Sequence, residues 1–387
     1  MEETMRRRLL RRPNSAASVA IIPDELMLEI LSSLPVKPLI RFRCVNKFFN
    51  TLVFDPHFVQ MHLNKSSQNS QLALTYYEVE GYKSSLVTLS IPGLLQKQFT
   101  TFHRSDPYHL LNDYYYLCNP QQRVVGSCNG LLLIVISCPY RDEWISFWNP
   151  AMRTKSENFK ICPDSTLRSR SHYKFSFGYD ILTQTYKVIA FYFYVQERKR
   201  GCKSKCVVKV FSLGDNSWRD IQCPPVSPLD YHRDNNNNNC GVHLNGTINW
   251  LARKDLIVSL DLSTETYTQL LLPRIFDCLP KLVVLNKCLC FCLDVEKTHF
   301  VIWKMKDFGV QDSWIQLFKI SYENFTKVKL LPLYLCVDDD ILILANDGNN
   351  KAFIYYCRDN KVEEIGITNV IMWFQAKNYV ESLVLTH

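Results

Sequence analysis

The chain has 387 residues, of which 47% are hydrophobic and 13% aromatic. This length leaves room for more than one domain, and this composition allows a large buried core. No apolar run reaches the roughly 18 residues that predict a membrane-spanning helix, and the basic opening stretch lacks a cleavage-like site. We therefore expect neither a membrane protein nor a secreted one.

The net charge is +8, and residues 1–19 carry five arginines and two glutamates, which together supply +3 of it. The cluster "RRRLLRR" leaves open a nuclear address or a phosphate-binding arm, but a bare charge cluster is more typical of a solvated, disordered tail. The remainder is mildly basic and has no stripe of alternating arginine and aromatic residues. Nucleic-acid binding therefore gains little support.

The 15 cysteines include no C-x-x-C pair, and their odd number argues against a complete set of disulfides. Cys288, Cys290 and Cys292 alternate along one predicted strand and are interpreted as small core residues. Cys202 and Cys206 lie in a basic stretch without a nearby histidine, which makes them a weak metal candidate. We expect reduced thiols in the cytoplasm or nucleus, with no metal and no cofactor.

The first predicted element is a helix over residues 23–34, "PDELMLEILSSL". Pro23 suits the first helical position, and Pro35 disfavours helix beyond Leu34. At about 100° per residue, the apolar side chains of this helix cover an arc of about 200°, which is wider than the stripe of about 100° that lies on one core. These residues are Leu26, Met27, Leu28, Ile30, Leu31 and Leu34.

Further short helices are expected over residues 38–45, after a cap at Asn46, and after a cap at Asp55 followed by Pro56. A unit of about 40 residues is near the lower limit for folding alone. Two explanations of the excess apolar surface remain open. It packs on the rest of this chain, or it is the docking face for another protein.

The stretch from Ile22 to Val53 resembles an F-box. Ile22-Pro23 stands at the usual Leu-Pro, and "FRCVNKFFNTLV" matches Arg-Cys-Val-x-Lys-x-Trp-x-x-Leu-Ile, with Asn46 where Cys or Ser is commoner and Phe49 in place of tryptophan. The resemblance implies an adaptor-binding domain over residues 20–65 that binds a Skp-type adaptor and, through it, a cullin-RING assembly. The residues that it implies at or just behind this interface are Pro23, Leu26, Ile30, Leu34, Pro35, Leu39, Val45 and Phe49.

After about residue 70, helical periodicity gives way to short alternating apolar runs broken by turn pairs. The pairs expected to form hairpin turns are Asn129-Gly130, Asn245-Gly246, Asn286-Lys287 and Asp339-Asp340. Asn-Gly is the strongest of these hairpin signals. The layout recurs every 40 to 60 residues or so, which is about the spacing of propeller blades.

We therefore predict a β-propeller of about six blades over residues 70–387. The expected blades cover residues 72–103, 124–159, 173–221, 241–273, 281–320 and 331–367. The final "NYVESLVLT" is predicted to be a strand that completes the first blade and joins the chain ends. Residues 223–240, rich in proline and asparagine, predict a long polar loop at one end of the ring.

The segments "GSCNGLLL", "FWNPAMRTK", "FGYDILTQTYKVI" and "YVESLV" are similar to the F-box-associated domain of plant F-box proteins, a group that includes S-locus F-box and F-box/kelch members. Together the two resemblances imply an α+β protein, with a small N-terminal helical F-box followed by an all-β propeller that recognises a target. Tryptophans at blade-like positions are interpreted as core or blade-to-blade packing. They are Trp148, Trp218, Trp250, Trp303 and Trp314.

No nucleophile elbow, phosphate-binding loop, zinc-protease motif or dinucleotide fingerprint is present in the sequence. We therefore expect a non-catalytic substrate receptor of an SCF-type ubiquitin ligase, which holds an unidentified target protein close to the loaded ubiquitin carrier. Two alternatives stay open. One is a propeller scaffold or nucleic-acid-associated protein without ligase coupling, and the other is a propeller enzyme with a site at the central channel.

Overall fold

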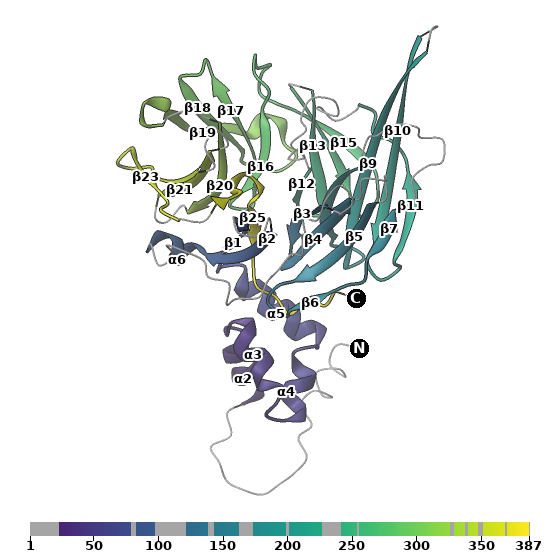
Figure 1. The fold of residues 1–387 in the computed structure, drawn as a ribbon, viewed down its shortest axis with the longest axis vertical. Helices are drawn as coiled ribbons and strands as arrows, with labels where there is room; N and C mark the ends of the chain where they lie inside the picture. Colours follow the sequence, from purple (N-terminus) through teal and green to yellow (C-terminus); the bar gives the residue numbers. More distant parts are fainter. Residues whose placement is uncertain are drawn as a thin grey trace, which may run out of the picture.

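Within the residues that the computed structural model describes, four short helices precede a ring of six β-sheets (Figure 1). The described residues are 23–78, 83–96, 121–137, 143–161, 173–198, 201–226, 241–253, 255–325, 329–336, 340–346, 351–367 and 370–386. The predicted tail over residues 1–19 and most of the predicted loop over residues 223–240 lie outside these ranges.

The four helices form the expected F-box-like unit, and both predicted side-chain caps are confirmed. The helices are α2 (Asp24–Leu31), α3 (Val36–Phe42), α4 (Lys47–Leu52) and α5 (Pro56–Ser66). Asn46 Oδ1 accepts a hydrogen bond from the backbone N–H of Phe49 at 3.0 Å. Asp55 Oδ1 accepts one from the N–H of Phe58 at 2.9 Å. Each bond satisfies a backbone donor that has no partner within its helix.

Helix α2 is shorter than predicted, because it ends at Leu31 instead of near Leu34. The hydroxyl groups of Ser32 and Ser33 both donate to the carbonyl of Glu29, at 2.9 and 3.1 Å. Such back-bonding competes with the backbone hydrogen bonds that would extend the helix. The chain therefore turns before it reaches the proline.

Two further boundaries differ from the prediction. Pro23 is the N-cap of α2 instead of its first helical residue. Helix α3 runs over Val36–Phe42 instead of residues 38–45, with Pro35 at its N-cap. Pro38 fits inside the first turn of α3, where its missing N–H leaves no helical hydrogen bond unmade.

The six sheets are the blades of a propeller, and five of them run in simple chain order from the innermost strand outward. Blade 1 comprises β1 (Gln71–Glu78), β2 (Lys83–Ser90), β24 (Val370–Ile371) and β25 (Lys377–Tyr379), with helix α6 (Ile91–Leu95) after β2. Blade 2 comprises β3 (Gln121–Cys128), β4 (Leu131–Ser137), β5 (Glu143–Asn149), β6 (Thr154–Lys155) and β7 (Phe159–Ile161). Blade 3 comprises β8 (Lys174–Asp180), β9 (Thr185–Arg198), β10 (Gly201–Ser212) and β11 (Ser217–Ile221).

Blades 4 to 6 have the same four-stranded antiparallel order. Blade 4 comprises β12 (Val242–Leu244), β13 (Thr247–Arg253), β14 (Leu256–Asp261) and β15 (Tyr267–Leu271). Blade 5 comprises β16 (Lys281–Leu285), β17 (Cys288–Val295), β18 (His299–Met305) and β19 (Trp314–Ser321). Blade 6 comprises β20 (Leu330–Cys336), β21 (Ile341–Asn346), β22 (Lys351–Tyr356) and β23 (Lys361–Glu364). Three short 3₁₀ turns cover Gln311–Ser313, Tyr322–Asn324 and Trp373–Gln375. The predicted propeller of about six blades is confirmed.

The ring closes because the end of the chain supplies the innermost strand of blade 1. Strands β24 and β25 both pair with β1, as in the pairs Tyr76↔Ile371 and Leu72↔Asn378. Strand β25 contacts β3 on one side and β20 on the other, so it completes the inner ring of strands. The predicted closing strand is confirmed only at its start, since β25 ends at Tyr379.

The predicted turn pairs join the first two strands of blades 2, 4 and 5, and the described member of the fourth pair precedes β21 of blade 6. Their φ angles are 49° at Asn129, 82° at Gly130, 47° at Asn245, 76° at Gly246, 45° at Asn286, 57° at Lys287 and 51° at Asp340. Positive φ at both central residues matches the right-handed twist of the flanking strands. Asparagine, aspartate and glycine reach this region more readily than other residues.

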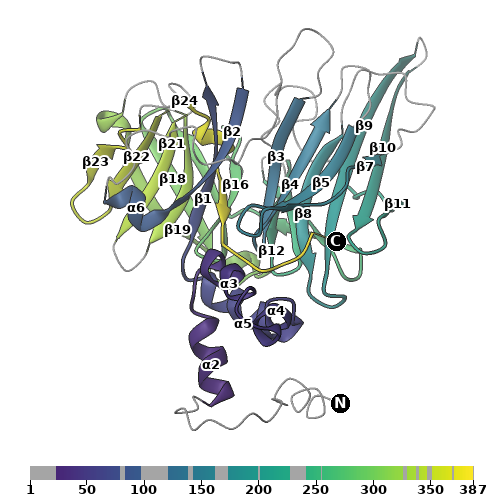
Figure 2. The same cartoon turned by 60° about the horizontal axis from the view of Figure 1, so that its bottom comes forward.

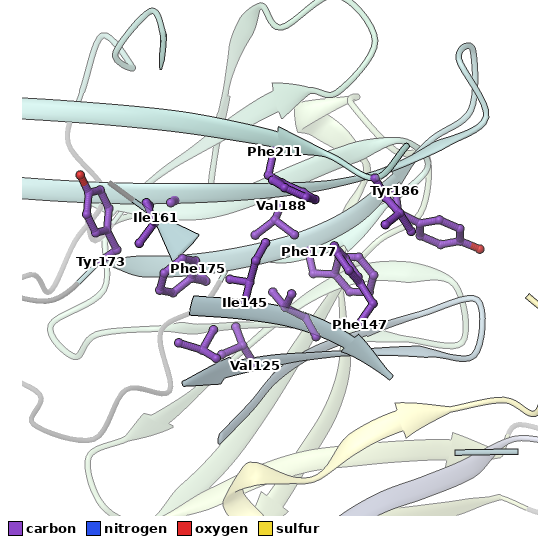
Figure 3. Close-up of a cluster of buried hydrophobic side chains, with 14 of the residues drawn as sticks. Val125, Ile145, Phe147, Ile161, Tyr173, Phe175, Phe177, Tyr186, Val188 and Phe211 are labelled. Carbon is purple, nitrogen blue, oxygen red and sulfur yellow. The ribbon is translucent and has the colours of Figure 1, made fainter. Parts of the chain in front are cut away.

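Hydrophobic clusters between neighbouring blades form the core. Phe147 of β5 lies between Phe177 of β8 and Phe211 of β10, with ring centroids 5.6 and 5.9 Å from it (Figure 3). The predicted packing role of the tryptophans is confirmed. They lie buried or half-buried in such clusters, as Trp148, Trp218, Trp250, Trp303 and Trp314. Cys290 and Cys292 are likewise buried between blades 5 and 6.

Candidate functional site

The helices carry an apolar face that nothing in the described chain covers. The exposed fractions are 55% for Leu26, 57% for Ile30 and 64% for Val45. At about 100° per residue, Leu26 and Ile30 lie within about 40° of each other on α2. They therefore form one stripe on the surface of that helix.

The other residues that the resemblance implied divide into three kinds. Pro23 and Pro35 are exposed at the two ends of α2 and its turn. Leu34 and Phe49 are half-buried. Leu39 is only 1% exposed and belongs to the interior of the helical unit. Adaptor contact by these residues stays a prediction, and Leu39 supports the face from behind.

Two aromatic residues that sequence reasoning did not single out are also exposed on the helical unit. Phe42 and Phe54 are 36% and 38% exposed. The ring of Phe42 lies 5.6 Å from that of Phe49, and the guanidinium of Arg43 lies 4.7 Å above the ring of Phe54. The sequence held a signal for them, because Phe42 begins the segment that matches the end of an F-box and Phe54 directly follows it. Their exposure depends on helix packing, which the motif does not specify.

The opposite side of the helical unit packs on the propeller. Its core includes Leu31, which lies about 100° around α2 from Ile30, and Leu39. The remaining buried members are Val36, Leu52, Val53, Phe58 and Leu383. The wide apolar arc of α2 thus has two uses. One edge of it faces this chain, and the other faces solvent.

Leu383 comes from the end of the chain, which runs between the helices and blade 2 (Figure 2). Its exposed fraction is 0%. Two residues before Leu383, Glu381 Oε2 accepts a hydrogen bond from the N–H of Val36 at 3.1 Å. This bond satisfies a donor in the first turn of α3. Ala151 and Met152, in the turn after β5, pack on the same cluster. We name residues 380–386 the C-terminal strap.

Blade 2 holds the strap through one buried side chain. Asn149 Nδ2 donates to the carbonyl oxygens of Ser382 and Val384, at 2.9 and 2.8 Å. A buried segment from the end of the chain therefore joins the helices to the ring.

Two polar contacts fix α5 against the end of α2. His62 is 0% exposed, and its Nε2 lies 2.9 Å from the carbonyl oxygen of Leu34, to which it donates as the neutral ring. Burial lowers the pKa of His62, although the bond to Leu34 and the charge of Glu381 raise it in part. Lys65 Nζ donates to the carbonyl oxygen of Glu29 at 2.8 Å.

A small cavity with mostly apolar walls lies between the start of α2 and helices α4 and α5, on the side of α2 away from Leu26. Leu28, Phe48 and Leu52 are among its walls. Asp24, Asp55 and His57 also line it, and Asp55 is the residue that caps α5.

The inner strands of the propeller bring together one cysteine and one histidine. Cys128 Sγ lies 3.7 Å from Nδ1 of His243, whose Nε2 accepts from the N–H of Tyr179 at 3.2 Å. Burial raises the pKa of Cys128 to about 12, and burial lowers the pKa of His243. Both side chains are therefore neutral at pH 7, and the thiolate that nucleophilic chemistry needs is not formed. The contact serves packing between blades 2, 3 and 4.

Within the described ranges, no group of three or more His, Cys, Asp or Glu residues is placed to hold a metal ion. In the same part of the chain, no helix is both long and apolar enough to span a membrane. A bare apolar helical face fixed to a propeller is typical of proteins that bind other proteins.

Comparison with known proteins then gives the family. The F-box domain model matches residues 20–60, and the model of the F-box associated beta propeller domain matches residues 98–385. The chain belongs to the F-box proteins that carry an F-box associated β-propeller domain.

Two curated relatives from Arabidopsis thaliana match along nearly their whole length. An F-box/kelch-repeat protein is 26% identical over 383 residues, covering 94% of this chain and 95% of the relative. The F-box protein CPR1 is 25% identical over 402 residues, covering 95% of this chain and 89% of the relative. Among solved structures, a chain from the crystal structure of a nidogen/laminin complex aligns with a TM-score of 0.39 and 10% identity, over 81% of this chain and 99% of that chain.

Proposed function

We propose that this protein is the substrate receptor of an SCF-type ubiquitin ligase, and that it binds a Skp-type adaptor through the bare face of its F-box. An F-box generally implies binding to an adaptor of this type. The observation that carries the proposal is the exposure of Leu26 and Ile30, at 55% and 57%, on the helix where the family resemblance expects adaptor contact.

The energetics favour a partner for this face. Fully burying a leucine or isoleucine side chain contributes about 1.5 to 3 kcal/mol. Contiguous apolar side chains left in water, within an F-box, are typical of a protein interaction surface. Leu26 and Ile30 offer an apolar stripe on α2, and Phe42, Val45 and Phe54 are further exposed apolar side chains of the helical unit.

The mechanism that we propose is proximity. The helices lie at one end of the ring, and strands β9 and β10 extend away from them (Figure 1). The C-terminal strap holds the two parts together through Leu383 and Glu381. A target bound on the propeller would therefore be held at a set distance from the adaptor, and catalysis would come from other subunits.

The test is retention of the full-length chain by an immobilised Skp-type adaptor. The variant Leu26→Asp plus Ile30→Asp changes two exposed side chains to carboxylates, and we expect it to lose retention by at least about 100-fold, which corresponds to about 2.8 kcal/mol. A matched control is Leu182→Asp plus Ile275→Asp, because these propeller residues are 77% and 74% exposed. We expect the control variant to bind like the unmodified chain.

Two outcomes would contradict the proposal. One is a failure of the unmodified chain to bind the adaptor, which would favour a scaffold without ligase coupling. The other is full retention of the Leu26→Asp plus Ile30→Asp variant, which would place the adaptor elsewhere. Circular dichroism of each variant distinguishes lost binding from lost folding.

A further inference from the structure

Two cysteines face each other at the outer edge of blade 3. Strands β10 and β11 pair antiparallel, with Val210 opposite Arg219 and Val208 opposite Ile221. Continuing this register by two residues places Cys206 opposite Cys223. The contact is kept beyond the end of β11, because Cys223 Sγ donates to the carbonyl oxygen of Cys206 at 3.2 Å.

This placement suits a disulfide. Directly opposed residues of an antiparallel pair have Cα atoms about 4.5 or 5.5 Å apart, and both values lie inside the range of about 4.4 to 6.8 Å found for disulfides. Their Cβ atoms are about 4.5 to 5.5 Å apart, whereas a relaxed disulfide needs about 3.8 Å. The strands must therefore draw together slightly, and a strained bond of this kind is more easily reduced.

The surroundings keep the two thiols together and within reach of small reagents. Both cysteines are half-buried and free, and they pack with Ile221 and Tyr267 on the same cluster. Tyr267, from β15 of the next blade, donates its hydroxyl to the carbonyl oxygen of Gln222 at 2.9 Å, which fixes the chain beside Cys223. Burial and the neighbouring thiol raise the pKa of Cys206. Cys223 lies just past the end of β11, outside the paired strands, so it is placed to react first.

We propose that Cys206 and Cys223 form a reversible cross-strand disulfide when the protein meets an oxidising thiol buffer, with a low-molecular-weight disulfide such as oxidised glutathione as the oxidant. Cys223, as its thiolate, attacks one sulfur of the small disulfide and releases one glutathione thiolate. Cys206, as its thiolate, then attacks the Cys223 sulfur of the mixed disulfide and releases the second glutathione.

The two steps balance. Two protein thiols lose two electrons and two protons in total, and the small disulfide accepts them to become two glutathione thiols. Excess reduced glutathione or dithiothreitol reverses both steps by the same route. The bond is independent of adaptor binding, because it lies in blade 3 and the F-box face lies on the helices.

The position gives the bond a structural consequence. Only residues Val208–Ser212 of β10 pair with β11, whereas the earlier part of β10 pairs with β9 alone. The two cysteines therefore stand where β11 leaves the sheet. A bond between them fastens the base of the extended β9–β10 hairpin to the start of the connection that leads into blade 4.

The test equilibrates the full-length protein in buffers of varied reduced to oxidised glutathione ratio, quenches with acid, alkylates free thiols and maps peptides by mass spectrometry. We expect a peptide pair linked through Cys206 and Cys223 to accumulate as the buffer becomes oxidising and to disappear with dithiothreitol. The single variants Cys206→Ser and Cys223→Ser should each abolish it. Cys357→Ser, at another half-buried free thiol, should leave it unchanged.

Three results would overturn the proposal. The first is that both cysteines remain alkylated as free thiols across the whole series. The second is that Cys223 carries only glutathione, with no link to Cys206. The third is that the mapped bond joins either cysteine to a different residue, such as Cys202 or Cys240. Circular dichroism of the serine variants shows whether a lost link reflects a lost thiol or a lost fold.

Discussion

Shortening Leu383 to alanine should loosen the F-box helices from the ring. The side chain is 0% exposed and packs among residues of α2 to α5. Buried leucine-to-alanine changes cost about 2 to 5 kcal/mol, because apolar contacts are lost and a cavity remains. If the strap couples the helices to the ring, Leu383→Ala should lower the free energy of opening the helical unit by about this amount.

Hydrogen exchange measured by mass spectrometry is the appropriate assay, because it reports each segment of the full-length chain separately. A loss of about 2 to 5 kcal/mol corresponds to about 30-fold to 4,000-fold faster exchange of protected amides. We expect at least the lower value for the amides of α3 and α5. The amides of blade 6 should keep their protection.

The matched control is Leu342→Ala, which removes the same volume from a site that is also 0% exposed, in the core between blades 5 and 6. It should speed exchange in those blades and spare the helices. Unchanged protection of α3 and α5 in Leu383→Ala would refute the idea that the strap secures the F-box. So would equal loosening of the helices by Leu342→Ala.

Three further predictions concern buried positions of the propeller, the helices and the strap. Asp180→Asn should lower the urea stability of the propeller by about 3 kcal/mol, since a buried ion pair loses one partner; Asp180 Oδ2 lies 2.9 Å from Lys187 Nζ. Burial alone raises the pKa of Asp180, but hydrogen bonds from Ser263, Thr183 and Lys187 bring it below its usual value. The free energy of unfolding should therefore fall as pH drops below about 4. Asp180→Asn should remove much of this pH dependence. Burial lowers the pKa of His62. The hydrogen-exchange protection of α5, corrected for intrinsic rates, should therefore fall as pH drops below about 6.5. An increase in this protection at low pH would contradict the prediction. Gly130→Ala should displace the strap, because a Cβ there would lie 2.1 Å from Ser382 Oγ, at a φ of 82°. We expect faster hydrogen exchange of residues 380–386 in this variant.

Local features of the fold could be predicted from the sequence where the cause is itself local. Asn129-Gly130 forms a turn because those two residues tolerate positive φ, whatever surrounds them. Asn46 and Asp55 cap helices because each side chain reaches a backbone N–H three residues ahead. The blade repeat can be recognised in the sequence for the same reason, because the residues of each hairpin turn are themselves a local signal.

The strap could not be predicted in this way. Its alternating apolar pattern indicates a strand, yet no strand continues past Tyr379. The reason is the side chain of Asn149, which lies far away in the sequence and takes the carbonyl groups of Ser382 and Val384 that a strand neighbour would have taken. Only the folded ring brings these groups together, so the contact leaves no periodic signal.

The family-like segment "FGYDILTQTYKVI" shows a related limit. Its charged residues, Asp180 and Lys187, look available for a target, but they are 0% and 6% exposed. Lys187 Nζ also donates to the carbonyl oxygen of Leu262 at 2.5 Å, across the junction to blade 4. A motif shared by a family thus marks the joint between two blades here, and it says little about which molecule the propeller captures.

Helix α2 has one buried and one exposed set of apolar side chains, and this difference affects how an adaptor would bind. Leu31 and Leu39 are already covered, in part by Leu383, so a partner that required them would first have to displace the strap. Leu26 and Ile30 require no such opening, because they are bare in the free chain. Adaptor association should therefore bury a preformed surface without a conformational change, which favours an ordinary association rate of about 10⁵ to 10⁷ M⁻¹s⁻¹. A rate well below this range, raised by Leu383→Ala, would show instead that the strap must move before the adaptor can bind.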